Sequence, residues 1–180
     1  ISQILDLYFF IILPSVFGII AVGSEIVRIV SNEQLAKTGS PVIPIIALAM
    51  FFYGLFTVYF QILNVNKNTY ASGKWWTIAS VVNIGLNFIF IPKIGIIGAA
   101  VSTFISYLIA TIGVYTYVSD RVNHNVGNML KYFFVSLVMY LIIEIFTQLI
   151  GESLAYIPLG VLIYSAIAYS LEFYPDILID

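Results

Sequence analysis

The stretch NIGLNFIFIPKIGIIGAA, residues 83–100, sets two asparagines, a Pro-Lys corner and three glycines among apolar residues. Asn83 and Asn87 are four residues apart, so they share one face of a helix. Pro92 is expected to end that helix, because proline cannot continue the backbone hydrogen bonding of a helix interior. Gly95 and Gly98 are expected to let the next helix pack closely against its neighbour. The stretch therefore predicts two long helices joined by a tight turn.

The composition extends this prediction to the whole chain. Of the 180 residues, 61% are hydrophobic and 9% are charged, and the mean hydropathy is +1.04. A soluble domain of this size needs a charged exterior that these residues do not supply. The sequence therefore predicts an all-α integral membrane protein.

Apolar segments long enough to cross a bilayer recur along the chain. A hydrocarbon core of about 30 Å requires roughly 20 apolar residues in one helix. Polar loops, glycines and prolines divide the sequence into six such segments. In the second of them, Ser40 and Pro41 are typical of a capped helix start. The predicted spans are residues 6–30, 41–64, 73–91, 95–118, 130–150 and 153–173.

The charges in the loops predict an orientation. With six spans and short connections, the loops at 64–74 and 119–131 lie on the same side as both termini. That side carries one more Lys or Arg than the other. The positive-inside rule then places both termini in the cytoplasm. The chain begins Ile1-Ser2-Gln3, without a signal-peptide pattern, and is expected to be cut from something longer.

Polar side chains at helical spacing mark the faces that are expected to turn away from lipid. They lie in the second, third and fifth spans, and a stripe of small residues follows the fourth. Each polar stripe is open to two interpretations, hydrogen bonding between helices or contact with a substrate. The stripes are Tyr53, Thr57, Gln61 and Asn64; Trp76, Ser80, Asn83 and Asn87; Ser136, Tyr140, Glu144 and Gln148; and Gly95, Ala99, Thr103, Ser106, Ala110 and Gly113.

Individual charged and helix-breaking residues suggest further roles. Glu144 is the only carboxylate well inside an apolar segment, which indicates either a functional acid or a neutral, hydrogen-bonded structural one. Arg28 follows Glu25 by three residues, which favours an ion pair, with an anionic headgroup as the alternative ligand. Pro14 and Gly18 interrupt the first span, where they either bend the helix or mark a place that moves.

Several function classes are disfavoured. The net charge of −2 and the lack of a basic stripe argue against nucleic-acid binding. There is no cysteine, so disulfides and cysteine-based metal sites are excluded. His124 lies in an Asn-rich loop without a second ligand, and we predict neither a metal nor a cofactor. The sequence contains no HExxH, P-loop or GxGxxG motif, and we expect no enzyme activity.

The region around the opening stretch resembles a known transporter superfamily. The N-x-x-x-N of Asn83 and Asn87, the turn Ile91-Pro92-Lys93 and the motif Gly95–Ala100 continue into Thr103–Tyr107. This series resembles the MOP exporter superfamily, most closely its polysaccharide branch, the Wzx-type oligosaccharide flippases. The resemblance is clear over residues 61–107 and extends over roughly residues 5–120.

The resemblance implies a fold of two six-helix lobes around a central cavity. This chain would then form one lobe over residues 1–180, the C-terminal one, with the N-terminal lobe missing. It implies transport of a lipid-linked oligosaccharide (a polyisoprenyl-pyrophosphate sugar) across the plasma membrane by alternating access. The partners would be that glycan, membrane lipid and the missing lobe. The substrate path would involve Arg28, Tyr53, Thr57, Gln61 and Asn64, whereas Asn83, Asn87, Pro92, Gly95 and Gly98 would serve helix packing.

Two other functions remain open on the sequence. The related multidrug exporters share this architecture, and Glu144 would then be the carboxylate that couples export to H⁺ or Na⁺. A membrane scaffold that transports nothing is the third possibility. In that case substitutions along the stripe of the second span would change stability and no ligand binding.

Overall fold

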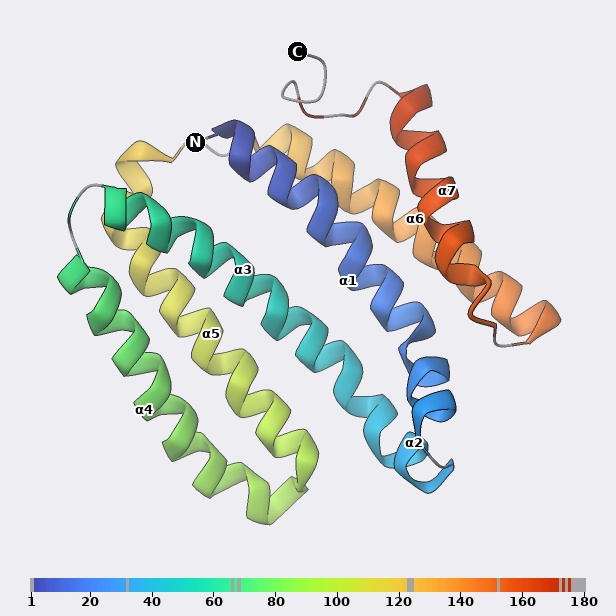
Figure 1. Ribbon diagram of the computed structural model, residues 1–180, viewed down its shortest axis with the longest axis horizontal. Helices are drawn as coiled ribbons and strands as arrows, with labels where there is room; N and C mark the ends of the chain where they lie inside the picture. The colour runs from blue at the N-terminus through green and yellow to red at the C-terminus, as the bar shows by residue number, and fades with distance from the viewer. Residues whose placement is uncertain are drawn as a thin grey trace. The chain divides into compact units, whose positions relative to one another are not determined.

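The computed structural model describes residues 2–31, 33–65, 67, 69–122, 125–151, 153–171, 173 and 175. Most of these residues are helical, and no strand occurs among them (Figure 1). This confirms the all-α prediction. The elements are α1 (Ser2–Val30), α2 (Glu33–Gly39), η1 (Ser40–Val42), α3 (Ile43–Val65), α4 (Thr69–Ile94), α5 (Ile96–Val118), η2 (Ser119–Arg121), α6 (Val126–Ile150) and α7 (Tyr156–Ser170).

Five helical segments among the described residues are long and apolar enough to cross a membrane. They are Ser2–Val30, Ala36–Val65, Tyr70–Ile94, Ile96–Arg121 and Val126–Ile150, and they match the first five predicted spans. The sixth span was predicted over residues 153–173, but α7 has only 15 residues. At 1.5 Å per residue α7 is about 22 Å long, so it falls short of the hydrocarbon thickness.

The sequence predicted that Ser40 caps the start of the second span, but the structure does not show this cap. The chain is already helical in α2, and the Ser40 hydroxyl donates a hydrogen bond backward to the carbonyl of Ala36 at 2.7 Å. Pro41 lies in the short element η1, which leads directly into α3. Proline is tolerated there because the amides of a first turn have no helical acceptor to lose.

The turn in the opening stretch also lies later than predicted. Pro92 is inside α4, which continues to Ile94, so the prediction that it ends the helix is wrong. A proline in the last turn of a helix removes a single hydrogen bond near an end that is already incomplete. The reversal occurs at Gly95, whose φ of +60° is accessible to glycine at little steric cost.

The first of two compact units consists of residues 1–43 and 124–180 and contains α1, α6 and α7. Aromatic side chains pack α1 against α6: the ring centroids of Phe10 and Tyr132 are 5.5 Å apart, and those of Phe17 and Tyr140 are 6.0 Å apart. Helix α7 covers this pair. The buried core of the unit comprises Val22, Val135, Met139, Ile143, Tyr156 and Tyr164.

The second unit, residues 44–123, contains α3, α4 and α5. Helices α4 and α5 form an antiparallel hairpin with very close backbones (Figure 1). A Cβ atom on Gly98 would lie 2.5 Å from the carbonyl carbon and oxygen of Phe90, and one on Gly113 would overlap the Trp75 ring. Helix α3 joins the hairpin through the Thr111 hydroxyl, which donates to the carbonyl of Phe52 at 2.8 Å. The organisation of the chain as one six-helix lobe stays a prediction.

Candidate functional site

A pocket lined by both polar and apolar side chains lies between α4 and α5 in the second unit and has a volume of about 230 Å³. We call it the α4–α5 pocket. The polar stripe predicted for the third span provides one wall, and α5 provides the other. Pro92, Gly95 and Gly98 are not among its described lining residues. The pocket is lined by Trp76, Ala79, Ser80, Asn83, Ile84, Thr103, Ser106 and Tyr107.

Aromatic rings form one end of the α4–α5 pocket. The Trp76 indole is stacked on the Tyr107 ring, with centroids 6.4 Å apart and planes 13° apart. The Trp76 indole also stacks on the Phe56 ring, and their centroids are 5.3 Å apart. The Trp76 side chain still has an exposed fraction of 42%. A partly exposed aromatic side chain beside polar groups suits a ligand that has both C–H surface and hydroxyl groups, as a sugar ring does.

Tyr53 is the residue of the predicted α3 stripe that reaches this aromatic end. Its ring centroid lies 5.1 Å from that of Tyr107 and 6.1 Å from that of Trp76. The Thr57 hydroxyl instead donates to the Tyr53 carbonyl on its own helix at 2.9 Å. Gln61 is exposed and Asn64 is half-buried, farther along α3. The structure therefore connects the first residue of the predicted stripe to the α4–α5 pocket.

Hydroxyl groups along the pocket direct their protons to the backbone. Ser80 donates to the carbonyl of Trp76 at 3.0 Å, and Thr103 donates to that of Ala99 at 2.9 Å. A hydroxyl oxygen that donates its proton keeps lone pairs for accepting. The walls therefore present acceptor oxygens, which suit a ligand rich in hydroxyl donors.

The two asparagines of the opening stretch are placed differently. The Asn83 amide donates across the hairpin to the Thr103 hydroxyl oxygen at 3.4 Å, whereas the Asn87 amide donates to the Asn83 side chain on its own helix at 3.0 Å. The Asn87 Oδ1 atom is buried, and it accepts no hydrogen bond from the described residues. A buried acceptor of this kind favours a bound donor such as water.

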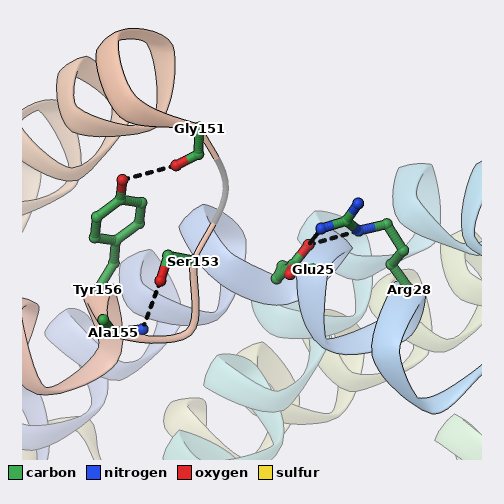
Figure 2. Close-up of polar contacts among 6 residues, drawn as sticks. All are labelled: Glu25, Arg28, Gly151, Ser153, Ala155 and Tyr156. Atoms are coloured by element: carbon green, nitrogen blue, oxygen red, sulfur yellow. Dashed lines mark hydrogen bonds and ion pairs between the residues drawn. The ribbon is translucent and has the colours of Figure 1, made fainter.

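Arg28 and Glu25 lie on α1, in the first unit, and form an ion pair (Figure 2). The Arg28 Nε atom donates to Glu25 Oε2 at 2.7 Å, and a terminal guanidinium nitrogen lies 2.6 Å from the same oxygen. Glu25 is buried, whereas the Arg28 side chain is 53% exposed. The structure thus contains the ion pair that the spacing favoured.

Glu144 lies on α6, six residues before its last residue, Ile150. At 1.5 Å per residue this is about 9 Å from the helix end. Its side chain is half-buried, and no described residue forms a hydrogen bond or an ion pair with it. The described residues thus supply no partner for the structural interpretation of this acid.

A second cavity lies in the first unit, between α1, α6 and α7. We call it the α1–α7 groove; its volume is about 470 Å³ and its walls are almost entirely apolar. Pro14 and Gly18 both border the groove. The sequence predicted that they either bend α1 or mark a position where it moves. The groove is lined by Phe10, Ile11, Pro14, Ser15, Gly18, Ile19, Val22, Ile26, Met139, Ile143, Tyr156, Ile157, Gly160, Val161, Tyr164 and Ser165.

The α5 wall of the pocket was missed on the sequence, because the small residues of that span were assigned to packing alone. Ser106 and Thr103 belong to that stripe and line the pocket, and Tyr107 was not singled out as a site residue. The available signal was the T-x-x-S-Y spacing, which places two hydroxyls and a tyrosine on adjoining positions of one helix. Which partner helix they face is not encoded in that spacing.

Within the described part of the chain, no three His, Cys, Asp or Glu side chains lie close enough to hold a metal ion. His124, which the sequence judged a poor metal ligand, lies outside the described residues. The expectation of no metal and no cofactor stays a prediction.

Comparisons with known proteins agree on one family. The family model described as "Lipid II flippase MurJ" matches residues 1–169. A solved structure titled "Lipid II flippase MurJ, inward closed conformation" matches with a TM-score of 0.79 and 26% sequence identity, over 94% of this chain and 37% of that chain. Among curated proteins, no match was found. This chain therefore spans a little over a third of the solved relative.

Proposed function

The chain belongs to the lipid II flippase MurJ family, and from this premise we propose that it forms part of a flippase for a lipid-linked glycan. The family is a member of the MOP exporter superfamily that the sequence resembles, and it is a transporter family rather than an enzyme family. The polysaccharide branch is not specifically supported. Lipid II is therefore the first substrate to test, and a lipid-linked oligosaccharide is the second.

The α4–α5 pocket is the observation that carries the proposal. It combines the exposed Trp76 ring with the acceptor oxygens of Ser80 and Thr103 on helices of membrane length. A polar hollow in a membrane-length segment is costly unless it meets water or a polar ligand. The sugar of a lipid-linked glycan offers hydroxyl donors for the oxygens and C–H surface for the ring. We assign this pocket to the glycan part of the substrate.

The α1–α7 groove is suited to the hydrocarbon part of such a substrate. Its walls are almost entirely apolar, and Gly18 leaves space along α1. Burial of a hydrocarbon chain there requires no polar partner. A lipid-linked glycan has a polar part and a hydrocarbon part, and each of these hollows is chemically suited to one of them.

The substrate path is proposed to include Tyr53, Thr57, Gln61 and Asn64 of α3 as contacts for sugar hydroxyls. Arg28 is a candidate for the pyrophosphate, because a guanidinium matches the geometry of phosphate oxygens. Transport would proceed by alternating access between two lobes in the plasma membrane, with both termini of this chain cytoplasmic. The second lobe would be the N-terminal part of the same protein.

The experiment that tests the function uses the full-length parent in two strains. One is depleted of its lipid II flippase, and the other lacks its oligosaccharide flippase. Rescue of growth in the first strain identifies lipid II, and restored surface glycan in the second identifies an oligosaccharide. The purified parent is also placed in vesicles with fluorescent lipid II and with a fluorescent lipid-linked oligosaccharide. Failure to flip either lipid contradicts the proposal.

A substitution in the path accompanies this experiment. Gln61→Leu removes an exposed amide of α3 and is expected to lower rescue at unchanged protein level. Val65→Leu, at the exposed end of the same helix, is the matched control. If Gln61→Leu changes only protein level, the scaffold interpretation gains support.

The half-buried Glu144 without a described partner favours a second candidate, cation-coupled export of small organic cations. An intramembrane carboxylate is costly and is often part of a proton or ion pathway. Glu144→Gln keeps the shape of the side chain and removes its charge. Loss of H⁺- or Na⁺-driven efflux of an organic cation by this variant would support the candidate, and full activity would contradict it.

A further inference from the structure

Pro14 leaves one carbonyl of α1 without its usual donor. In an α-helix the N–H of residue 14 would donate to the carbonyl of residue 10, but proline has no N–H. Pro14 lies in the interior of α1, twelve residues after its first residue, Ser2. The Phe10 carbonyl therefore needs another partner, since a carbonyl without a hydrogen bond in hydrocarbon costs several kcal/mol of free energy.

A hydroxyl from α7 meets this carbonyl. Tyr164 donates a hydrogen bond to the Phe10 oxygen at 2.8 Å, although the two residues are 154 positions apart. The Tyr164 side chain is buried, and its ring packs against the ring of Phe10 with centroids 5.4 Å apart. The hydroxyl and the ring of one tyrosine thus both contact the residue whose carbonyl Pro14 leaves unpaired.

We propose that Tyr164 is a positioning residue whose hydroxyl replaces the N–H that Pro14 lacks, and that this bond sets where α7 lies against α1. The role goes beyond flipping as such, because it concerns how the walls of the α1–α7 groove are held. Phe10, Pro14 and Tyr164 all border that groove. The hydrogen bond from Tyr164 to the Phe10 carbonyl holds α1 to α7 beside Pro14. It thereby sets the width of the groove at that level.

A second contact of α7 keeps the helix in register. Gly160 lies one turn before Tyr164, and a Cβ atom there would come within 2.9 Å of the Ile143 Cδ1 atom of α6. The glycine lets α7 approach α6 closely, while Tyr164 holds it to α1. Loss of the hydroxyl alone should therefore loosen the contact with α1 and leave the contact with α6 in place.

The test is a double-mutant cycle in the full-length parent, purified in nanodiscs. Tyr164→Phe removes the hydroxyl and keeps the ring. Pro14→Ala restores an N–H that can donate to the Phe10 carbonyl within α1. We expect Tyr164→Phe to lower the melting temperature by about 2–6 °C in the native background and by less than half as much in the Pro14→Ala background. Tyr169→Phe, on the exposed side of α7, is the matched control and should leave the melting temperature unchanged.

Equal losses in the two backgrounds would overturn the proposal, because a tyrosine that only fills space does not sense residue 14. Hydrogen–deuterium exchange gives a second measurement if the double variant does not fold. Tyr164→Phe should then speed exchange of the α1 amides around residues 11–18 and leave the amides of α4 unchanged. Unchanged exchange in that part of α1 would also overturn the proposal.

Discussion

The α4–α5 pocket and the α1–α7 groove differ in size and in chemistry. The α4–α5 pocket is small and polar, and its walls belong to a helix pair whose backbones touch at Gly98. The α1–α7 groove has about twice the volume, is apolar, and is walled mainly by long side chains around Gly18. A polar hollow needs fixed partners, because each misplaced group is left unsatisfied, whereas apolar contacts do not depend on direction. The chain thus offers a partly polar site in one unit and an apolar one in the other.

The largest effect is expected at the contact that fixes the polar pocket. Gly98→Ala places a Cβ atom 2.5 Å from the Phe90 backbone, which no side-chain rotation can relieve. We expect it to destabilise the protein by about 1–3 kcal/mol or more, as overpacking does. Thermal melting of the purified parent measures this. Gly85→Ala, at an open position of α4, should be neutral or slightly stabilising.

A loss of transport is expected when the aromatic wall is removed. Trp76→Leu keeps an apolar side chain and removes the stacking face at the α4–α5 pocket. An aromatic contact contributes about 0.5–1.5 kcal/mol beyond its buried area, so flipping is expected to fall roughly tenfold at low substrate concentration. The assay is lipid flipping in vesicles. Tyr70→Leu, an exposed aromatic near the start of α4, is the control. Equal activity of the two variants would remove the pocket from the path.

A smaller effect is expected in the apolar groove. A Cβ atom at Gly18 meets nothing within 4 Å, so Gly18→Leu should fold normally and fill part of the groove. Because apolar contacts do not depend on direction, we expect only about a two- to threefold loss of flipping, roughly 0.5 kcal/mol. Gly73→Leu, also at an open position on a long helix, is the matched control. Full activity of Gly18→Leu would show that the groove does not hold the substrate.

The smallest effect on stability is expected at the Glu25–Arg28 pair. The Arg28 side chain is more than half exposed, so solvent screens its charge, and a glutamine at this position keeps a hydrogen-bond donor for the buried Glu25. Arg28→Gln is expected to lower stability by less than about 1 kcal/mol. A normal melting temperature together with lost flipping would place Arg28 in the substrate path, whereas retained flipping would restrict it to the ion pair.

The sequence predicted the class and most of the span boundaries. Run length and the scarcity of charge determine helices that cross a membrane, because every backbone polar group in hydrocarbon must be satisfied within the helix. The resemblance carried by Asn83, Pro92 and Gly95 predicted the superfamily. The prediction that Pro92 ends its helix was wrong, and α7 is shorter than the predicted sixth span. Both differences lie at helix ends, where the conformation of the terminal turn, more than any single residue, determines where the helix stops.

One helix face of the α4–α5 pocket follows from the sequence, although the predicted substrate path stays a prediction. Helical spacing put Trp76, Ser80 and Asn83 on one face, and that face lines the α4–α5 pocket. The spacing could not show that Thr103 and Tyr107 of α5 complete it, because periodicity identifies a face without identifying what it faces. The same holds for Tyr164, which looks on the sequence like any other aromatic residue of an apolar helix.

What the sequence alone determined is therefore that the chain consists of apolar, membrane-length helices, where the first five of them lie and which polar residues share a helix face. What only the tertiary structure decided is which faces meet: Asn83 with Thr103, Trp76 with Tyr107, and the Tyr164 hydroxyl with the Phe10 carbonyl that Pro14 leaves unpaired. The physical reason is the distance along the chain over which each kind of interaction acts. Composition and periodicity act within one helix, whereas hydrogen bonds and ring contacts between helices depend on helix packing, which no local pattern records.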